Sequence, residues 1–167
     1  MLRRERVELT DPALGGSKQP YHALEGCPLT HARQRLARLE ESANALAFGA
    51  LRTLAGAMRT MGAEPRAAGI LASSGRVGTT LGATLASHAL IHTADGNHFR
   101  DALGHAAERL GLIVTRIPQR ALAERAGVAL EASPDEISAT LAALGRGLGA
   151  PWGADQKSAA LLAWLLL

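Results

Sequence analysis

The sequence predicts an α/β fold that is mostly helical, with a small sheet of two to four strands, a long N-terminal helix and a helical C-terminal third. Three observations predict it. Apolar residues recur at spacings of three and four between residues 31 and 61, as on one face of a helix. Two short apolar runs, 67–72 and 112–117, have the length and composition of strands and are separated by helical patterns. The last third carries helix start and stop signals without a strand pattern.

Composition limits the class of protein. The 167 residues suit one domain, and 47% hydrophobic residues are enough to form a core. The formal net charge of +3 is a mild excess. Its clearest cluster lies near the N-terminus, at Arg3, Arg4, Arg6, Arg33, Arg35 and Arg38. Because a nucleic-acid binder usually gathers its charge on one face, this excess is a weak indication of nucleic acid as a partner.

Cysteine usage and hydropathy indicate the compartment. Cys27 is the single cysteine, which excludes an intrachain disulfide framework and a multi-cysteine zinc site. A reducing environment is the simplest interpretation. No apolar run of signal-peptide length follows the first residues, and no run reaches the roughly 18 apolar residues of a membrane span. We therefore expect a cytoplasmic protein that does not enter a membrane.

The chain divides at about residue 30. Residues 1–29 carry several prolines and glycines without periodicity, which predicts a largely irregular N-terminal arm. We expect this arm to be ordered only where Tyr21 or Leu24 contacts the body, and a solvated tail is the simpler alternative. Residues 30–167 are predicted to form a single globular α/β domain.

The longest helix is predicted over residues 31–61, with Thr30 as its cap and Gly62 as its stop. At 1.5 Å per residue it would be roughly 46 Å long, which is more than a small domain needs. It could bend near Gly49, split in two, or pair with a second chain to form a homodimer. Packing of the apolar face across its own domain is the alternative.

A glycine-rich turn follows the strand at 67–72. The chain could return there as a hairpin to about Thr79. Because free amides at a helix start bind anions, the turn also predicts an anion-binding loop for a phosphate-containing or other anionic small molecule. Its residues are Gly75, Arg76, Gly78, Thr79 and Thr80. The lysine of the P-loop pattern is missing, so a threonine-capped turn explains the same residues.

The helical pattern between the two strands is predicted to break. One helix covers 81–94, Asp95-Gly96-Asn97 reads as a turn, and a second helix begins at Asn97 and ends at Gly111. The strand at 112–117 follows and ends at Pro118. Strand, helices and strand in this order predict a βαβ-like unit.

The C-terminal third is predicted to contain three helices. The first runs from Pro118 to about Ala132, and the second begins with a serine cap at Ser133 and ends at Gly149. The third follows the turn Pro151-Trp152-Gly153.

Histidines cluster at the predicted corner between the two central helices. His88 and His92 are four residues apart, so they project from one helix face, with Asp95 one turn further on. Two imidazoles and a carboxylate in this pattern are candidates for acid–base catalysis. Three neighbours are predicted to support them: Ser87, His98 and Arg100. Metal binding and a hydrogen-bonded packing network are the alternatives, and no particular metal or cofactor is indicated.

These patterns predict a small enzyme, a hydrolase that acts on a phosphate-containing or other anionic substrate by His/Asp acid–base chemistry. Its site would lie where the loop at 73–80 meets the corner at 87–100. The alternative is a non-catalytic, dimeric interaction or regulatory module that binds a protein or nucleic acid.

Overall fold

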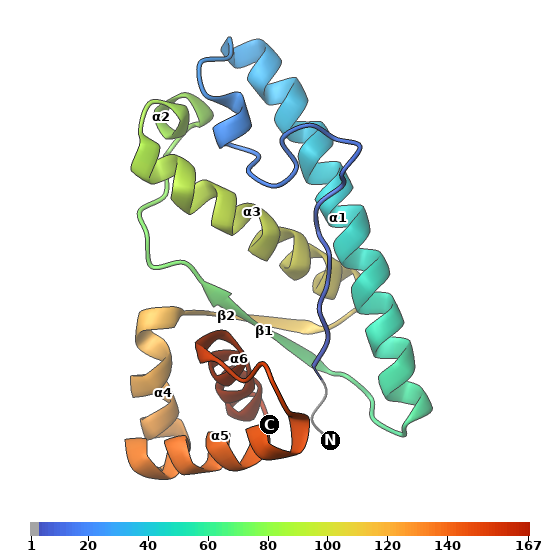
Figure 1. Cartoon of the computed structure of the whole chain (residues 1–167), viewed down its shortest axis with the longest axis vertical. Helices are drawn as coiled ribbons and strands as arrows, with labels where there is room; N and C mark the ends of the chain where they lie inside the picture. The colour runs from blue at the N-terminus through green and yellow to red at the C-terminus, as the bar shows by residue number, and fades with distance from the viewer. Residues whose placement is uncertain (1–3) are drawn as a thin grey trace. The chain divides into compact units, whose positions relative to one another are not determined.

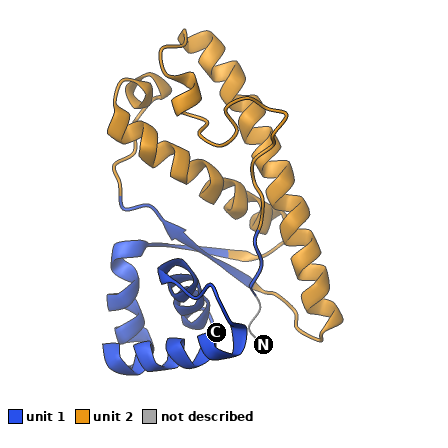
Figure 2. Ribbon diagram, in the orientation of Figure 1, with its two compact units in different colours: residues 1–6, 67–74, 114–167 blue, residues 7–66, 75–113 orange. Residues whose placement is uncertain are grey.

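The computed structural model describes residues 4–167 and confirms the predicted fold class. The chain is 61% helical and contains one parallel two-stranded sheet. It forms two compact units, which Figure 2 shows in different colours. Unit 1 contains residues 67–74 and 114–167 with a short N-terminal piece, and unit 2 contains residues 7–66 and 75–113. The predicted division into an arm and one domain stays a prediction.

The long helix of unit 2 is α1, Leu29–Thr60, a single helix of 32 residues (Figure 1). The alternative that it splits in two is therefore wrong. Pro28 precedes its first turn, so Thr30 lies inside the helix and is not the predicted cap. Gly62 is the stop, as predicted, because its φ of 78° is the left-handed conformation that glycine adopts without strain.

The apolar face of α1 packs within unit 2 against α3, His88–Arg109. The contact is built from small residues, with Ala43 and Ala47 of α1 against Ala102 and Ala106 of α3. Alanines allow two helix backbones to approach closely. Packing inside unit 2 therefore explains the predicted apolar face of α1, and the homodimer stays a prediction.

The predicted break at Asp95-Gly96-Asn97 is wrong, because α3 runs through it without interruption. The helical pattern breaks earlier, between the five-residue helix α2 (Leu81–Leu85) and α3. Gly96 serves packing instead: a Cβ there would lie 2.6 Å from Nη1 of Arg100, whose guanidinium covers the glycine. The Gly96–Arg100 contact is a contact between neighbouring turns of one helix, and the helix therefore continues through residues that locally resemble a turn.

Unit 1 holds the sheet, formed by β1 (Ala67–Ala72) and β2 (Ile113–Pro118). Both predicted strands are confirmed. The alternative hairpin is wrong, because β1 pairs with β2 and not with residues near Thr79. Gly69 lets the last helix pack closely on β1, since a Cβ there would lie 2.5 Å from Cγ of Leu162.

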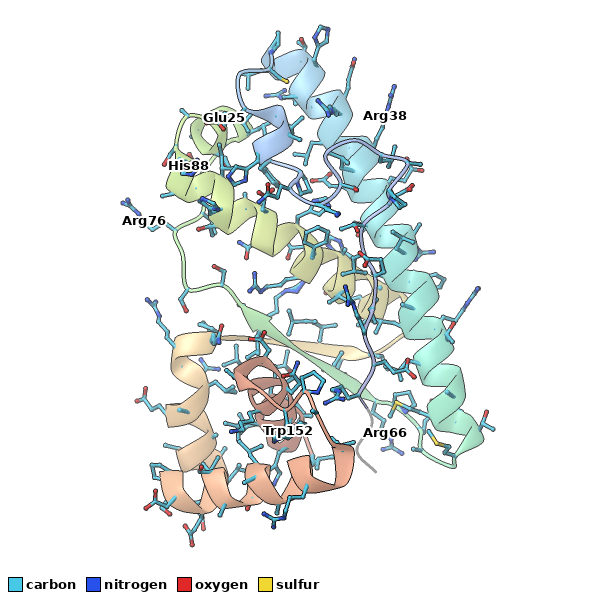
Figure 3. The ribbon with its side chains drawn as sticks, in the orientation of Figure 1. Glu25, Arg38, Arg66, Arg76, His88 and Trp152 are labelled. Atoms are coloured by element: carbon cyan, nitrogen blue, oxygen red, sulfur yellow. The ribbon has the colours of Figure 1, made fainter. Side chains whose placement is uncertain are left out.

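The rest of unit 1 consists of three helices after a short 3-10 turn (Gln119–Ala121): α4 (Leu122–Ala129), α5 (Pro134–Leu148) and α6 (Ala154–Leu165). The first is shorter than predicted. Ser133 makes the predicted capping box with Glu136, and Gly149 ends α5 as predicted. Figure 3 shows Trp152 between these helices, where its indole N–H donates to the Leu141 carbonyl at 3.0 Å.

The described part of the N-terminal segment is mostly irregular, as predicted, apart from the 3-10 helix η1, His22–Leu24. Leu24 is completely buried against Ala32 and Leu36 of α1, so this part of the arm belongs to the core of unit 2. Arg3, part of the predicted basic start, lies outside the described residues. None of the helices in residues 4–167 combines the length and hydropathy that a membrane crossing requires.

Candidate metal centre

Two histidines of α3 form one half of the candidate site. His88 and His92 are one helical turn apart, and their Nε2 atoms are 3.0 Å apart. Their ring centroids are separated by 4.5 Å, and both residues are exposed. The structure therefore brings this predicted pair together at the surface of unit 2.

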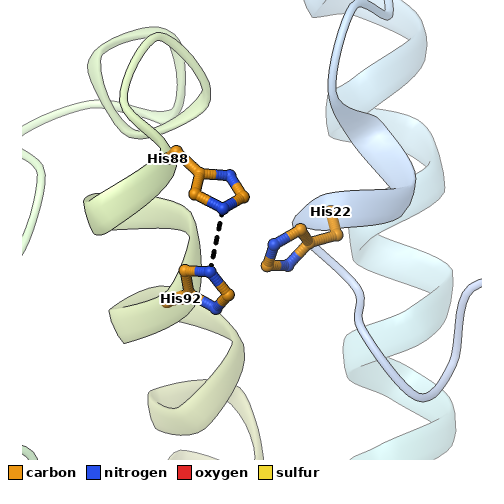
Figure 4. Close-up of side chains that lie close together, drawn as sticks. All are labelled: His22, His88 and His92. Carbon is orange, nitrogen blue, oxygen red and sulfur yellow. Dashed lines mark hydrogen bonds between the residues drawn. The ribbon is translucent and has the colours of Figure 1, made fainter.

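The third histidine comes from the N-terminal arm. His22 of η1 faces the α3 pair, with ring centroids 5.2 Å from His88 and 4.5 Å from His92 (Figure 4). One nitrogen of each ring lies within 4.8 Å of the other two. Among residues 4–167 this is the one group of three or more potential ligands that lie so close together. No local pattern indicates His22 as a site residue, because it lies in a segment without periodicity.

Asp95 holds the third histidine in place. Its carboxylate is almost buried, with 8% of the residue exposed, and one oxygen accepts from the backbone N–H of Tyr21 at 2.7 Å. The other oxygen accepts a hydrogen bond from Nδ1 of His22. With the proton on Nδ1, Nε2 of His22 carries a free lone pair. Asp95 therefore orients His22, whereas the sequence predicted that it acts with His88 and His92 in acid–base catalysis.

The three nitrogens have the spacing of a metal site. Zinc lies about 2.0–2.1 Å from imidazole nitrogens in a tetrahedral arrangement, so two such ligands are about 3.3 Å apart. The separations here run from 3.0 Å between His88 and His92 up to a maximum of 4.8 Å. Small side-chain rotations are enough to bring the three nitrogens to a common ion.

The three residues predicted to support the site lie elsewhere or act otherwise. Ser87 precedes α3 but makes no side-chain cap hydrogen bond, and Arg100 covers Gly96. His98 is 7% exposed, and burial lowers the pKa of its imidazole, against the raising effects of Asp95 and Asp101. His98 is therefore an interior residue and not part of the histidine cluster.

The predicted anion loop is separate from the three histidines. Thr80 caps α2 by accepting from the Ala83 N–H at 3.1 Å, as in the simpler interpretation of a threonine-capped turn. Residues 77–81 line a cavity of about 270 Å³ together with His98 and other α3 residues. Arg76 is exposed, does not line this cavity, and points away from the ribbon (Figure 3). Anion binding by this loop stays a prediction.

Comparisons with known proteins give no indication of function. The chain matches no protein-family model, no curated protein and no solved structure. Function is therefore inferred from the side chains that the fold brings together.

Proposed function

We propose that this protein binds a divalent transition metal, with Zn²⁺ as the best fit, through His22, His88 and His92. The observation that carries the proposal is the convergence of three imidazoles from two distant segments, with ligand nitrogens within 4.8 Å of one another. Imidazole nitrogen is a preferred ligand of zinc, and two histidines at positions i and i+4 of a helix bind one zinc ion in known metalloproteases.

The buried carboxylate supports this proposal independently. Histidines that bind metals almost always donate their second ring N–H to a carboxylate, a carbonyl or water, which fixes the ring and raises its basicity. Asp95 accepts from Nδ1 of His22 in this manner. A histidine that served packing alone would not need its second nitrogen to face two other imidazoles.

Three protein ligands indicate catalysis more than structure. Structural zinc sites usually have four protein ligands, whereas catalytic sites have three and leave a position for water or substrate. His88 and His92 are exposed, so that position faces solvent. A zinc ion there would supply a water of lowered pKa and polarise a substrate oxygen. We therefore propose a metal-dependent hydrolase.

The charge of the site favours an anionic substrate. Neutral imidazoles do not reduce the charge of the ion, so a Zn²⁺ held by three histidines keeps its full double positive charge. A phosphate or carboxylate group next to the scissile bond would be attracted to it. The free thiol of Cys27 agrees with the reducing, cytoplasmic setting that we propose for the protein.

The rival function, a dimeric interaction module, has less support. The helix face that suggested a dimer is buried in unit 2, where Leu39 and Ala43 are 3% and 2% exposed. A hydrogen-bonded packing network is the second alternative. It explains the 3.0 Å contact between His88 and His92, but both residues are exposed, so their contact adds little to stability.

Calorimetric titration of the EDTA-treated, dialysed full chain with Zn²⁺ tests the proposal. We expect one ion per chain, and His22→Ala, His88→Ala and His92→Ala should each weaken binding by at least the roughly 10–100-fold that is typical of losing even an outer-shell partner. His31→Ala is the matched control, because His31 is an exposed histidine outside the cluster. The proposal fails if zinc does not bind, or if the three variants bind it as the control does.

A further inference from the structure

Unit 1 contains a cavity of about 360 Å³, which is within the roughly 300–1,000 Å³ range of small-molecule pockets. It is bordered by the N-terminal segment, the end of α5 and the first half of α6. Its lining includes Arg4, Trp152, Asp155 and three alanines of α6, Ala159, Ala160 and Ala163. All of these residues belong to unit 1, whereas the three histidines of the candidate metal centre belong to unit 2. The cavity is therefore a separate candidate site.

The guanidinium group of Arg4 is held beside this cavity by backbone carbonyls. Its Nη1 donates to the carbonyls of Gly149 and Pro151, and its Nη2 donates to the carbonyl of Ala150 at 2.9 Å. These bonds fix the group next to the end of α5 and use three of the five N–H donors of a guanidinium. None of the described residues accepts a hydrogen bond from the other two, on Nε and Nη2. Together these two donors form an edge of the kind that binds a carboxylate with two parallel hydrogen bonds.

Trp152 gives the cavity an aromatic wall of fixed orientation. Its indole N–H donates to the Leu141 carbonyl at 3.0 Å. The ring also packs on Gly145, where a Cβ would lie 2.2 Å from Cδ1 of the indole. Both contacts hold the ring in one position, so its surface is formed before any ligand arrives. The three alanines of α6 have short side chains, which leave space beside the indole for an apolar group.

Charges of both signs line the cavity. Asp155 lies in the first turn of α6, is exposed, and contributes a carboxylate. Glu5 lines the cavity as well, but it has another interaction within the chain, so Asp155 is the better partner for a positive group. A ligand with negative charge alone would be repelled by Asp155, and one with positive charge alone by Arg4. The lining therefore favours a ligand that carries both charges and an apolar group.

We propose that this cavity binds a free α-amino acid with an apolar side chain, such as phenylalanine. The carboxylate of the ligand accepts from Nε and Nη2 of Arg4 in a bidentate, charge-assisted contact. Its ammonium group lies next to the carboxylate of Asp155. Its side chain packs against Trp152 and the alanines of α6, where an aromatic pair adds to the gain from apolar burial. Recognition thus needs all three parts of the ligand, and it does not depend on a metal ion in unit 2.

Titration of the full chain with L-phenylalanine at neutral pH, followed by heteronuclear NMR at the indole N–H of Trp152, tests the inference. We expect saturable shifts with a Kd on the order of 1 mM. Hydrocinnamate has the same ring and carboxylate without the ammonium group, and phenethylamine has the ammonium group without the carboxylate. Each should bind at least about tenfold more weakly, because each loses one charged contact. If both analogues bind as tightly as phenylalanine, the cavity selects only the ring, and the inference is overturned without any variant.

Charge-neutral variants give the second test. Arg4→Gln and Asp155→Asn should each weaken phenylalanine binding about tenfold or more, because each removes a charge-assisted contact. Arg146→Gln and Asp135→Asn are the matched controls, since both residues are exposed on α5 and do not line the cavity. Arg4→Gln also removes the contacts with the carbonyls beside α5, so Asp155→Asn, which leaves them in place, is the decisive variant. The inference is refuted if the wild type shows no saturable binding, or if Asp155→Asn binds phenylalanine as the controls do.

Discussion

Replacing Asp95 with asparagine tests how the candidate metal centre is built. The Asp95 carboxylate accepts from the Tyr21 backbone N–H at 2.7 Å and from Nδ1 of His22. An asparagine oxygen can still accept from Tyr21, but its NH₂ group can only donate toward His22. His22 would then accept at Nδ1 and carry its proton on Nε2, which removes the lone pair that faces the ion. The variant therefore disables a ligand without removing it.

The expected loss of zinc-induced stabilisation follows from the linkage between zinc binding and folding. Loss of an outer-shell partner typically weakens metal binding about 10–100-fold. Zinc at 100 times the wild-type Kd stabilises the wild type by about 2.7 kcal/mol, and the variant by only about 0.4–1.4 kcal/mol. For a chain of this length, 1 kcal/mol corresponds to about 2–4 °C in Tm. The zinc-induced rise in Tm should fall from about 5–11 °C to about 1–6 °C.

Thermal melting of metal-free protein, followed by circular dichroism with and without zinc, measures both effects. Without metal, Asp95→Asn should lose about 1–2 kcal/mol, because a charge-assisted hydrogen bond becomes a neutral one. Asp101→Asn is the control, since Asp101 is an exposed carboxylate of the same helix and should keep the full response to zinc. If Asp95→Asn melts lower but responds to zinc as the wild type does, the carboxylate only holds the arm, and the reasoning above is wrong.

Three further outcomes are expected. His88→Ala and His92→Ala should each change the metal-free stability by less than about 1 kcal/mol, because both residues are exposed, yet remove most of the zinc-induced rise in Tm. Burial lowers the pKa of His98 from its usual 6.5, so the folded state binds fewer protons than the unfolded state just below that value. The contribution of His98 to the free energy of unfolding should therefore be fully present above about pH 6.5 and decrease as the pH falls toward the lowered pKa. In a pH series of urea-unfolding curves, His98→Gln should reduce this loss of stability. Gly96→Ala should leave the free energy of unfolding unchanged or raise it by up to about 1 kcal/mol in the same urea assay, because alanine has the higher helix propensity and the flexible Arg100 side chain can move aside. A loss of more than about 1 kcal/mol would contradict this expectation.

Elements set by local signals could be predicted from the sequence. The periodic apolar face and the terminal glycine at Gly62 located α1, and the strand at 67–72 was predicted with its observed boundaries. Ser133, Pro134 and Glu136 form a start signal that depends on neighbouring residues only, so the beginning of α5 was also predicted. These features depend on residues close in sequence and not on tertiary contacts.

The candidate site could be predicted only in part, because half of it depends on tertiary contacts. The pair His88 and His92 follows from helical spacing alone. Asp95-Gly96-Asn97 carries residues typical of a turn, but the Asp95 carboxylate accepts hydrogen bonds from the arm, and the helix continues through all three residues. No pattern within one sequence connects His22 with α3, because the two segments meet only after the chain has folded.

The position of Tyr21-His22 gives the N-terminal arm a role in the candidate metal centre. Asp95 accepts from the backbone of Tyr21 and from the ring of His22, which fixes this dipeptide on α3. The His22 imidazole then faces His88 and His92. Leu24, two residues beyond His22, is completely buried and anchors the segment to α1. A solvated tail is therefore the wrong description of this part of the arm, and a substitution that detached Leu24 from α1 would impair the proposed zinc binding because it would displace His22.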